Sequence, residues 1–262
     1  MTQRANDLPL PASSGSPSSG PPGSGPFVLA ATVSAPFELA LSAGVDRRVL
    51  LARAGLNEGD LDEPDALVPR DAQTAIWEVV GELPEAETIA LDLAERSELG
   101  AMGVVGWAMT HAPNGRAVVD SIRRYARLFG DPYIPLIEHD ADRTVIHREF
   151  EPRIVATRVL PEYAPASTVV LLRRSLGLEA DEPLALEVWF QHSPPRDDSR
   201  HRALFACPIR FGAPETRLVL SGAALERPIE GRDPNLYAYL DRHALSLARG
   251  VPQTSTLAAR VS

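Results

Sequence analysis

Apolar residues in the first half of the chain recur at the spacing of an amphipathic helix. One stripe predicts a helix over residues 71–83; it comprises Ala72, Ile76, Val79, Val80 and Leu83. Asp71 stands where a side-chain cap is expected. The same period predicts helices over residues 47–54, 87–97 and 116–129, and Gly55 is a typical end for the first of them.

The period changes after residue 129. Residues 133–150 hold two short apolar runs around residues 140–142, which predicts a β-hairpin. Residues 184–192 predict a strand, with one face made of Leu186, Val188 and Phe190. Residues 207–211 and 218–220 flank a turn-rich connection and predict a second hairpin, in which Cys207 shares the apolar face of Ile209 and Phe211.

Helical spacing returns in three later segments, at residues 161–177, 198–206 and 234–249. Helices therefore dominate the first half, and mixed elements follow. This order predicts an α+β fold, in which a helical N-terminal half is followed by a small antiparallel sheet with packed helices and a C-terminal helix.

The ends of the chain differ in composition from the rest. Residues 1–26 are mostly Pro, Ser and Gly, which cannot bury enough apolar surface to offset the entropy of ordering, so we expect a disordered tail. The folded domain is expected over residues 27–249. No apolar run reaches the ~20 residues of a membrane helix, and the polar leader is unlike a signal peptide, which predicts a cytoplasmic protein.

Charge and residue usage exclude several functions. The net charge is −9, which argues against direct nucleic-acid binding, because phosphate contacts need a basic surface. All 26 basic residues are arginine, so P-loop and Schiff-base lysines are ruled out. Cys207 is the single cysteine. An internal disulfide and a multi-cysteine metal site are therefore excluded.

Catalytic motifs are missing from the sequence. There is no GxGxxG, no nucleophile elbow and no HExxH. His139 and His147 could face each other across the first hairpin and hold a metal, but histidine pairs with no third ligand are more often simply half-exposed. We therefore expect no enzyme activity, no cofactor and no metal.

The segment "GAMGVVG" at residues 100–106 allows two interpretations. Its glycines either bring the backbone close to a ligand or permit close packing around a helix start, and we favour packing because the main effect of glycine is steric permission. Met102, Trp107 and Met109 follow within a few residues. Such soft and aromatic side chains suit an adaptable apolar pocket, although ordinary core accounts for each of them as well.

Six segments together resemble the N-terminal effector-binding half of AraC/XylS-type transcription regulators, in the arabinose-binding-like branch. In chain order they are "GVDRRVLLARAGLNEGDLDEPDALVPRDAQTAIWEVVGEL", "LGAMGVVGWAM", "SIRRYARLFGD", "EVWFQHSPP", "HRALFACPIRFGAPETRLVL" and "LERPIEGRDPNLYAYLDRHALSLAR". The likeness runs from about residue 27 to residue 249. No single motif is decisive, and the ordered set carries the resemblance.

The resemblance implies a domain that binds a small, partly apolar effector and forms a homodimer. DNA would be bound only through a helix-turn-helix domain beyond this chain, to which residues 250–262 would be the linker. The alternatives are a stand-alone binding protein that acts through a protein partner and, less favoured, a small enzyme. Candidate ligand-binding residues are Met102, Trp107, His111, Tyr133, His147, Arg153 and Trp189. Candidate dimerisation residues are Leu236, Leu240, His243 and Leu247.

Overall fold

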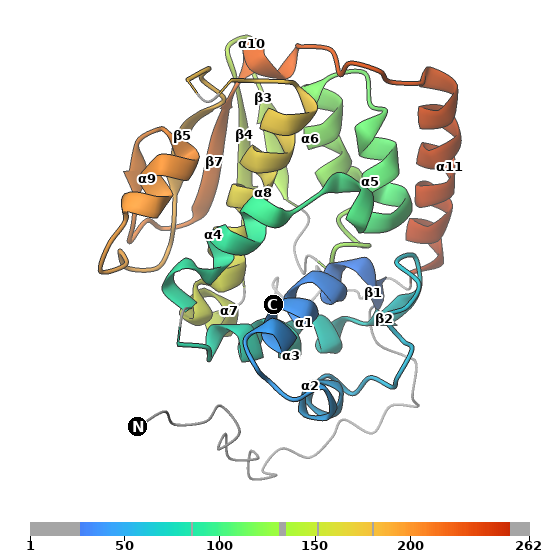
Figure 1. Cartoon of the computed structure of the whole chain (residues 1–262). Helices are drawn as coiled ribbons and strands as arrows, with labels where there is room; N and C mark the ends of the chain where they lie inside the picture. The colour runs from blue at the N-terminus through green and yellow to red at the C-terminus, as the bar shows by residue number, and fades with distance from the viewer. Residues whose placement is uncertain (1–26, 85, 131–134, 151, 180, 252–262) are drawn as a thin grey trace, which may run out of the picture.

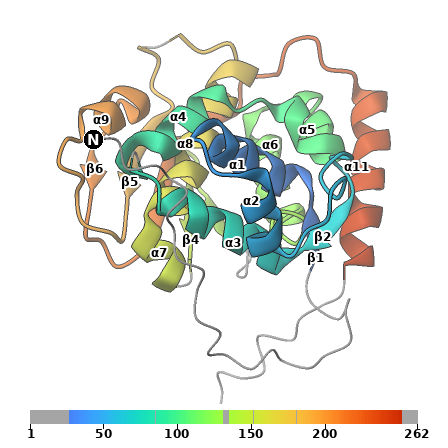
Figure 2. The same cartoon turned by 60° about the horizontal axis from the view of Figure 1, so that its bottom comes forward.

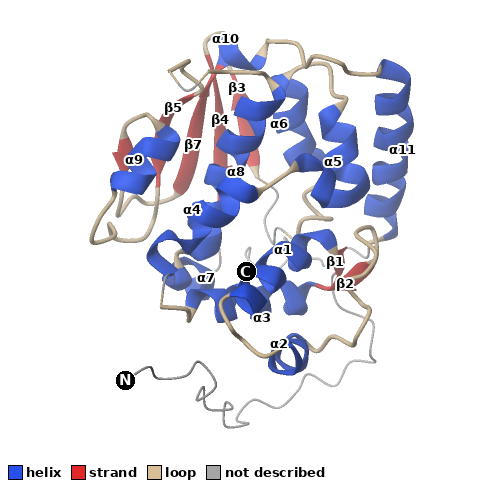
Figure 3. Ribbon diagram, viewed as in Figure 1, coloured by secondary structure: helices blue, strands red, loops and turns tan. Residues whose placement is uncertain are grey.

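The structure is a computed structural model that describes residues 27–84, 86–130, 135–150, 152–179 and 181–251. Helices and strands are mixed in it, so the predicted α+β class is confirmed. Figure 3 shows the strands of the larger sheet gathered in one region, with helices filling the rest. No helix in the described ranges combines the length and the apolar character needed to cross a membrane. The expected tail lies outside these ranges, and so does the expected linker from residue 252 onward.

One layer is built from the N-terminal helices. Helices α1 (Ala31–Ser42), α2 (Arg47–Ala54) and α3 (Arg70–Gly81) pack together at the bottom of Figure 1, beside a two-stranded sheet of β1 (Phe27–Leu29) and β2 (Leu67–Pro69). Their apolar side chains form a core of their own, around Phe37, Leu50 and Trp77. Helix α4 (Ala86–Arg96) contributes Leu93 to this core. It contributes Leu91 to a second apolar core, which includes Val188 and Leu218.

The second layer contains a five-stranded sheet of order β3-β4-β7-β5-β6. Its strands are β3 (Leu136–His139), β4 (Arg143–Arg148), β5 (Ala185–Trp189), β6 (Ile209–Arg210) and β7 (Thr216–Ser221). Neighbouring strands are antiparallel except for β5 and β6, which are parallel. Helix α8 (Val159–Ser175) lies across one face of the sheet and packs against α4 (Figure 1).

Shorter helices and the last long helix complete this layer. The 3₁₀ turn η2 (Leu99–Met102) leads into α5 (Gly103–Thr110), and α5 packs against α11 (Pro234–Gly250). Helix α11 lies along one side of the molecule, and α9 (Ser199–Phe205) lies at the opposite end, as Figures 1 and 2 agree. The remaining helices are α6 (Gly115–Arg124), α7 (Pro152–Thr157) and α10 (Gly222–Leu225).

Local signals placed several helices to within a few residues. Helix α2 ends at Gly55, whose left-handed φ of 63° suits a residue without a side chain, and it begins at Asp46, whose carboxylate accepts two backbone N–H groups. Helix α11 begins in the same way at Asp233. The prediction that Asp71 caps α3 is wrong, because Asp71 lies inside the first turn and Pro69 is the cap residue.

Two sheet predictions are also wrong. Residues 207–211 and 218–220 do not form a hairpin, because β7 inserts between β4 and β5, and β6 pairs instead with the outer edge of β5. Leu186 does not share the buried face of Val188, because the register of β5 shifts between Ala185 and Glu187, and Leu186 is exposed. The first hairpin is confirmed as β3 and β4.

The glycine segment around η2 packs closely against its own backbone. A Cβ atom added at Gly106 would lie 1.6 Å from the carbonyl oxygen of Leu99, which only glycine can avoid. Gly103 has a φ of 63°, and its neighbour Val104 donates its N–H to the Asp65 carboxylate at 2.8 Å. Close packing thus accounts for both glycines.

Candidate functional site

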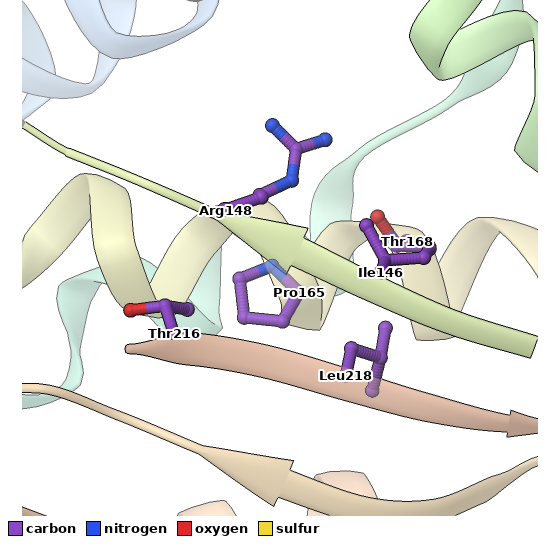
Figure 4. Close-up of a pocket in the computed structure, with 6 residues that line it drawn as sticks. All are labelled: Ile146, Arg148, Pro165, Thr168, Thr216 and Leu218. Atoms are coloured by element: carbon purple, nitrogen blue, oxygen red, sulfur yellow. The ribbon is translucent and has the colours of Figure 1, made fainter. Parts of the chain in front are cut away.

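A small pocket lies in the seam between α8 and the sheet. Its walls come from α8 and from the facing side of β4 and β7, as Figure 4 shows; the lining residues are Ile146, Arg148, Pro165, Thr168, Thr216 and Leu218. The cavity volume is about 10 Å³, enough for roughly one water molecule. Small-molecule sites typically have several hundred Å³, so a larger ligand requires α8 to move away from the sheet.

The pocket combines apolar walls with a few polar groups. Ile146, Pro165 and Leu218 supply the apolar surface, and Arg148 lies at the end of β4. Thr168 donates its hydroxyl to the carbonyl of Ala164 within α8. The hydroxyl of Thr216 is buried without a hydrogen-bond partner, which is costly in an apolar setting. A ligand that bonded this hydroxyl would remove that penalty.

A buried ionisable cluster occupies the same side of α8, one turn towards its N-terminus. Glu162 on α8 and His201 on α9 are fully buried, and His192, which follows β5, is nearly so. The carboxylate oxygens of Glu162 lie 3.3 Å from Nε2 of His192 and 3.0 Å from Nε2 of His201. None of these four buried atoms has a hydrogen-bond partner among the described residues.

Aromatic rings and one arginine enclose this cluster. Phe190 stacks on His192 at 5.2 Å between ring centroids and meets His201 edge-on at 6.1 Å. Phe211 contacts both histidines. Nη2 of Arg158 lies 3.7 Å from Oε1 of Glu162 and also donates to the carbonyl of Ser193. Burial lowers the pKa of His192 below its ordinary value.

The outer face of the sheet, opposite α8, carries a row of side chains in register. His147, Arg217 and Trp189 are direct partners across β4, β7 and β5, and Arg210 follows on β6. The guanidinium carbon of Arg217 lies 3.4 Å from the centroid of the Trp189 ring, and that of Arg210 lies 4.9 Å from it. Glu138 and Glu215 contact the two nitrogens of His147.

The candidate ligand-binding residues thus fall in separate places. His147 and Trp189 lie near each other on the outer sheet face, whereas Met102, Trp107 and His111 belong to η2 and α5. Trp107 is 53% exposed, and Nδ1 of His111 accepts the backbone N–H of Asp233 at the start of α11. None of these five lines the pocket. Tyr133 and the side chain of Arg153 lie outside the described residues.

Sequence reasoning missed the residues that the seam brings together. Glu162, His192 and His201 come from three separate elements, and no local pattern links them. One usable signal was that Glu162 stands on the apolar face of its predicted helix, three residues before Pro165. His139 and His147 do not face each other, because their partners in the hairpin are Thr144 and Leu136, which places them at opposite ends.

The described side chains do not build a metal centre. Within the described ranges, no group of three or more His, Cys, Asp or Glu side chains is arranged to hold a metal ion.

Comparison with known families identifies the class of protein. Residues 44–229 match the family described as the arabinose-binding domain of AraC transcription regulators, N-terminal. The match covers more than half of the chain, so the chain belongs to this family and is a regulatory domain of the AraC type, as the six segments predicted. The family's name does not identify the effector of any one member.

Individual relatives are also regulators. A segment of 92 residues is 32% identical to the uncharacterized HTH-type transcriptional regulators Rv1395 of Mycobacterium tuberculosis and Mb1430 of Mycobacterium bovis, and covers 35% of this chain and 27% of each relative. The fold resembles that of the transcriptional regulator CdpR from Pseudomonas aeruginosa, with a TM-score of 0.51 at 17% identity over 78% of this chain and 64% of that one.

Proposed function

We propose that this chain is the effector-sensing and dimerisation part of an AraC-type transcription regulator. The observation that carries the proposal is the family match over residues 44–229, taken together with a pocket in the seam between α8 and the sheet. DNA binding would belong to a helix-turn-helix domain elsewhere in the regulator, in keeping with the acidic net charge of −9. The protein would act in the cytoplasm.

The effector in this proposal is small and partly apolar. Ile146, Pro165 and Leu218 would contact its apolar part, and Thr216 and Arg148 would bind its polar groups. Because the pocket is nearly closed, the effector would select a form in which α8 stands further from the sheet. A ligand shifts such an equilibrium only by as much as it prefers the open form. Movement of α8 would thus be the first step of signalling.

The pocket can be tested by a thermal-shift screen of fatty acids, amino acids and sugars. Thr168→Ile adds bulk on the pocket side of α8, and Val170→Ile adds bulk on the same helix away from the pocket residues. We expect one ligand class to raise the Tm of the wild type, with its affinity reduced about tenfold or more by Thr168→Ile, which is a loss of about 1.4 kcal/mol. Val170→Ile should bind as the wild type does.

Two results would refute the pocket as the effector site. One is the absence of any stabilising ligand in the screen. The other is equal binding by both isoleucine variants, which would move the effector away from the seam while leaving the regulator proposal intact.

The proposed dimer contact is one flank of α11. Leu236 is 39% exposed and His243 is exposed, whereas Leu240 and Leu247 are half-buried against the domain's own core. The flank continues at Tyr239, which is 62% exposed. An apolar flank that extends into solvent on a surface helix is a common contact between subunits.

Light scattering of the whole chain tests this contact. Leu236→Glu places a charge on the apolar flank, and Ala238→Glu places the same charge on the opposite, exposed side of α11. We expect a dimer for the wild type and for Ala238→Glu, and a monomer for Leu236→Glu. A wild-type monomer, or equal dimerisation of all three proteins, would exclude this flank as the interface.

A further inference from the structure

Glu162 is the one Asp, Glu or Arg side chain among the described residues that is fully buried. A buried carboxylate needs hydrogen-bond donors in place of water. His201 can supply one N–H from Nε2, which lies 3.0 Å from Oε2. Oε1 has the Arg158 guanidinium 3.7 Å away, but Nη2 of Arg158 donates to the carbonyl of Ser193, and its side chain is 21% exposed to water. Oε1 therefore has an ion pair and no hydrogen-bond donor in the described part of the chain.

His192 turns a second acceptor towards the same oxygen. Its Nδ1 lies 3.0 Å from the carbonyl oxygen of Ser193, and because a carbonyl only accepts, Nδ1 carries the hydrogen. Burial lowers the pKa of His192, so the ring is neutral at neutral pH and Nε2 has a free lone pair. Nε2 lies 3.3 Å from Oε1 of Glu162. A single donor placed beside these two acceptors can bond to both of them.

The seam pocket leads to this pair of acceptors. Glu162 and Pro165 are three residues apart on α8 and so lie on one face of the helix, and Pro165 lines the pocket. On the opposite wall, the hydroxyl of Thr216 lacks a hydrogen-bond partner. Its oxygen points away from Thr168, towards the N-terminal turns of α8 (Figure 4). A displacement of α8 that enlarges the pocket therefore uncovers Glu162 as well.

We propose that the effector carries a protonated amino group, which binds to Glu162 and His192 while its apolar part occupies the seam pocket. This inference rests on the proposed effector site and adds the chemical class of the ligand. An ammonium group has three N–H donors and no acceptor, and its charge offsets the buried carboxylate. The rings of Phe190 and Phe211, which pack against His192, offer their faces to a cation.

Other polar end groups suit the site less well. A hydroxyl group supplies one donor and no charge, so it leaves the carboxylate uncompensated. A carboxylate group adds further acceptors and a like charge to a site that already has an excess of acceptors. The site therefore distinguishes ligands by their polar end, and three probes with the same alkyl chain can measure the difference.

Calorimetric titration of the full chain at pH 7.5 with hexylamine, hexan-1-ol and hexanoate tests the amino group. We expect hexylamine to bind about tenfold more tightly than hexan-1-ol or better, because hydrogen bonds between charged groups are the stronger ones. Hexanoate should bind most weakly. The inference is overturned if hexylamine does not bind, if hexan-1-ol binds equally well, or if hexanoate binds more tightly than hexylamine.

Glu162→Gln removes the charge and keeps the size of the side chain and one acceptor oxygen. It should weaken the binding of hexylamine about tenfold or more and leave that of hexan-1-ol within about twofold of the wild type. The matched control is Glu230→Gln, at an exposed carboxylate between α10 and α11, which should bind all three probes as the wild type does. Equal effects of the two substitutions on hexylamine would contradict the role of Glu162.

A measurement on the wild type covers the case in which Glu162→Gln does not fold. Hexylamine should shift the ¹⁵N NMR signal of His192 Nε2, because that nitrogen gains a donor, and hexan-1-ol should shift it less. A His192 signal that stays unchanged at saturating hexylamine would overturn the inference.

Failure of this inference differs from failure of the proposed effector site. Thr168→Ile reports on the pocket for any ligand, whereas Glu162→Gln reports on the amino group alone. A ligand whose affinity falls in Thr168→Ile and not in Glu162→Gln would keep the pocket and overturn the amino-group inference. A ligand that binds equally to both variants would refute the pocket and the inference together.

Discussion

Tyr125 joins the last helix to the rest of the domain, and its hydroxyl group can be removed alone. The ring is fully buried at the end of α6, and its hydroxyl donates to Oδ1 of Asp241 on α11. The same carboxylate oxygen accepts a second hydrogen bond, from Nη1 of Arg124 at 2.5 Å. Burial, reinforced by Asp241, raises the pKa of Tyr125. The hydroxyl is therefore a neutral donor throughout the ordinary pH range.

Tyr125→Phe deletes this donor without changing the packing of the ring. A hydrogen bond to a charged group contributes about 1.5–3 kcal/mol. Because Asp241 keeps Arg124 and is partly exposed, we expect the lower part of that range, about 1.5–2 kcal/mol. In a chain of this size that loss lowers the Tm by about 3–8 °C. Urea unfolding should show a lower midpoint with an unchanged m-value.

The control is Tyr239→Phe on α11, where the ring is 62% exposed. This substitution should change the free energy of unfolding by no more than about 0.5 kcal/mol. Asp241→Ala should cost more than Tyr125→Phe, because it leaves the Tyr125 hydroxyl buried without its acceptor, and Tyr125→Phe should cost little in that background. A Tyr125→Phe protein within about 0.3 kcal/mol of the wild type would refute the reasoning.

Three further changes test other features of the fold. Gly106→Ala should destabilise the domain by more than about 3 kcal/mol or prevent folding, because the added Cβ would overlap the carbonyl oxygen of Leu99. Gly250→Ala is the control, because a Cβ at that position meets no atom within 4 Å. Urea unfolding should show it to be nearly neutral. Thr216→Val should raise the unfolding free energy by about 1 kcal/mol, since it removes a buried hydroxyl that lacks a partner; a loss of stability would show that the hydroxyl is satisfied. Burial raises the pKa of Cys207 from 9.0 to about 11, so a thiol reagent at pH 8 should label the native protein about 100-fold more slowly than the unfolded one; equal rates would contradict this.

Helices were predictable from the sequence where their ends are set by nearby residues. Asp46 and Gly55 define α2 through hydrogen bonds and a left-handed turn within a few residues. Asp233 does the same for α11. Helix α6 stops at Arg124, although the apolar stripe continues to Phe129. There the spacing persisted through a run of turns, and periodicity alone could not locate the end.

The order of the strands could not be predicted, because it depends on pairing between distant segments. The residues of β6 and β7 have the composition of a hairpin, yet β7 pairs with β4 and β5. The alternation of apolar and polar residues around Val188, and likewise around Leu218, predicts that each of these side chains lies on a buried face. It does not predict which strand lies beside which. The same limit applies to the seam, where Glu162, His192 and His201 meet only after the sheet and α8 have assembled.

The central place of β7 has a consequence for the synthesis of the protein. On the ribosome, the N-terminal helices can collapse around Trp77 while later residues are still being added, because that core draws on early residues, with Val159 its latest buried member. The larger sheet cannot close until residues 216–221 emerge, since both β4 and β5 pair with them. Until then both strands have an unpaired edge, which is a site for aggregation. Slow translation while residues 216–221 are still inside the ribosome would prolong that exposure, and we expect chains halted at that stage to need a chaperone.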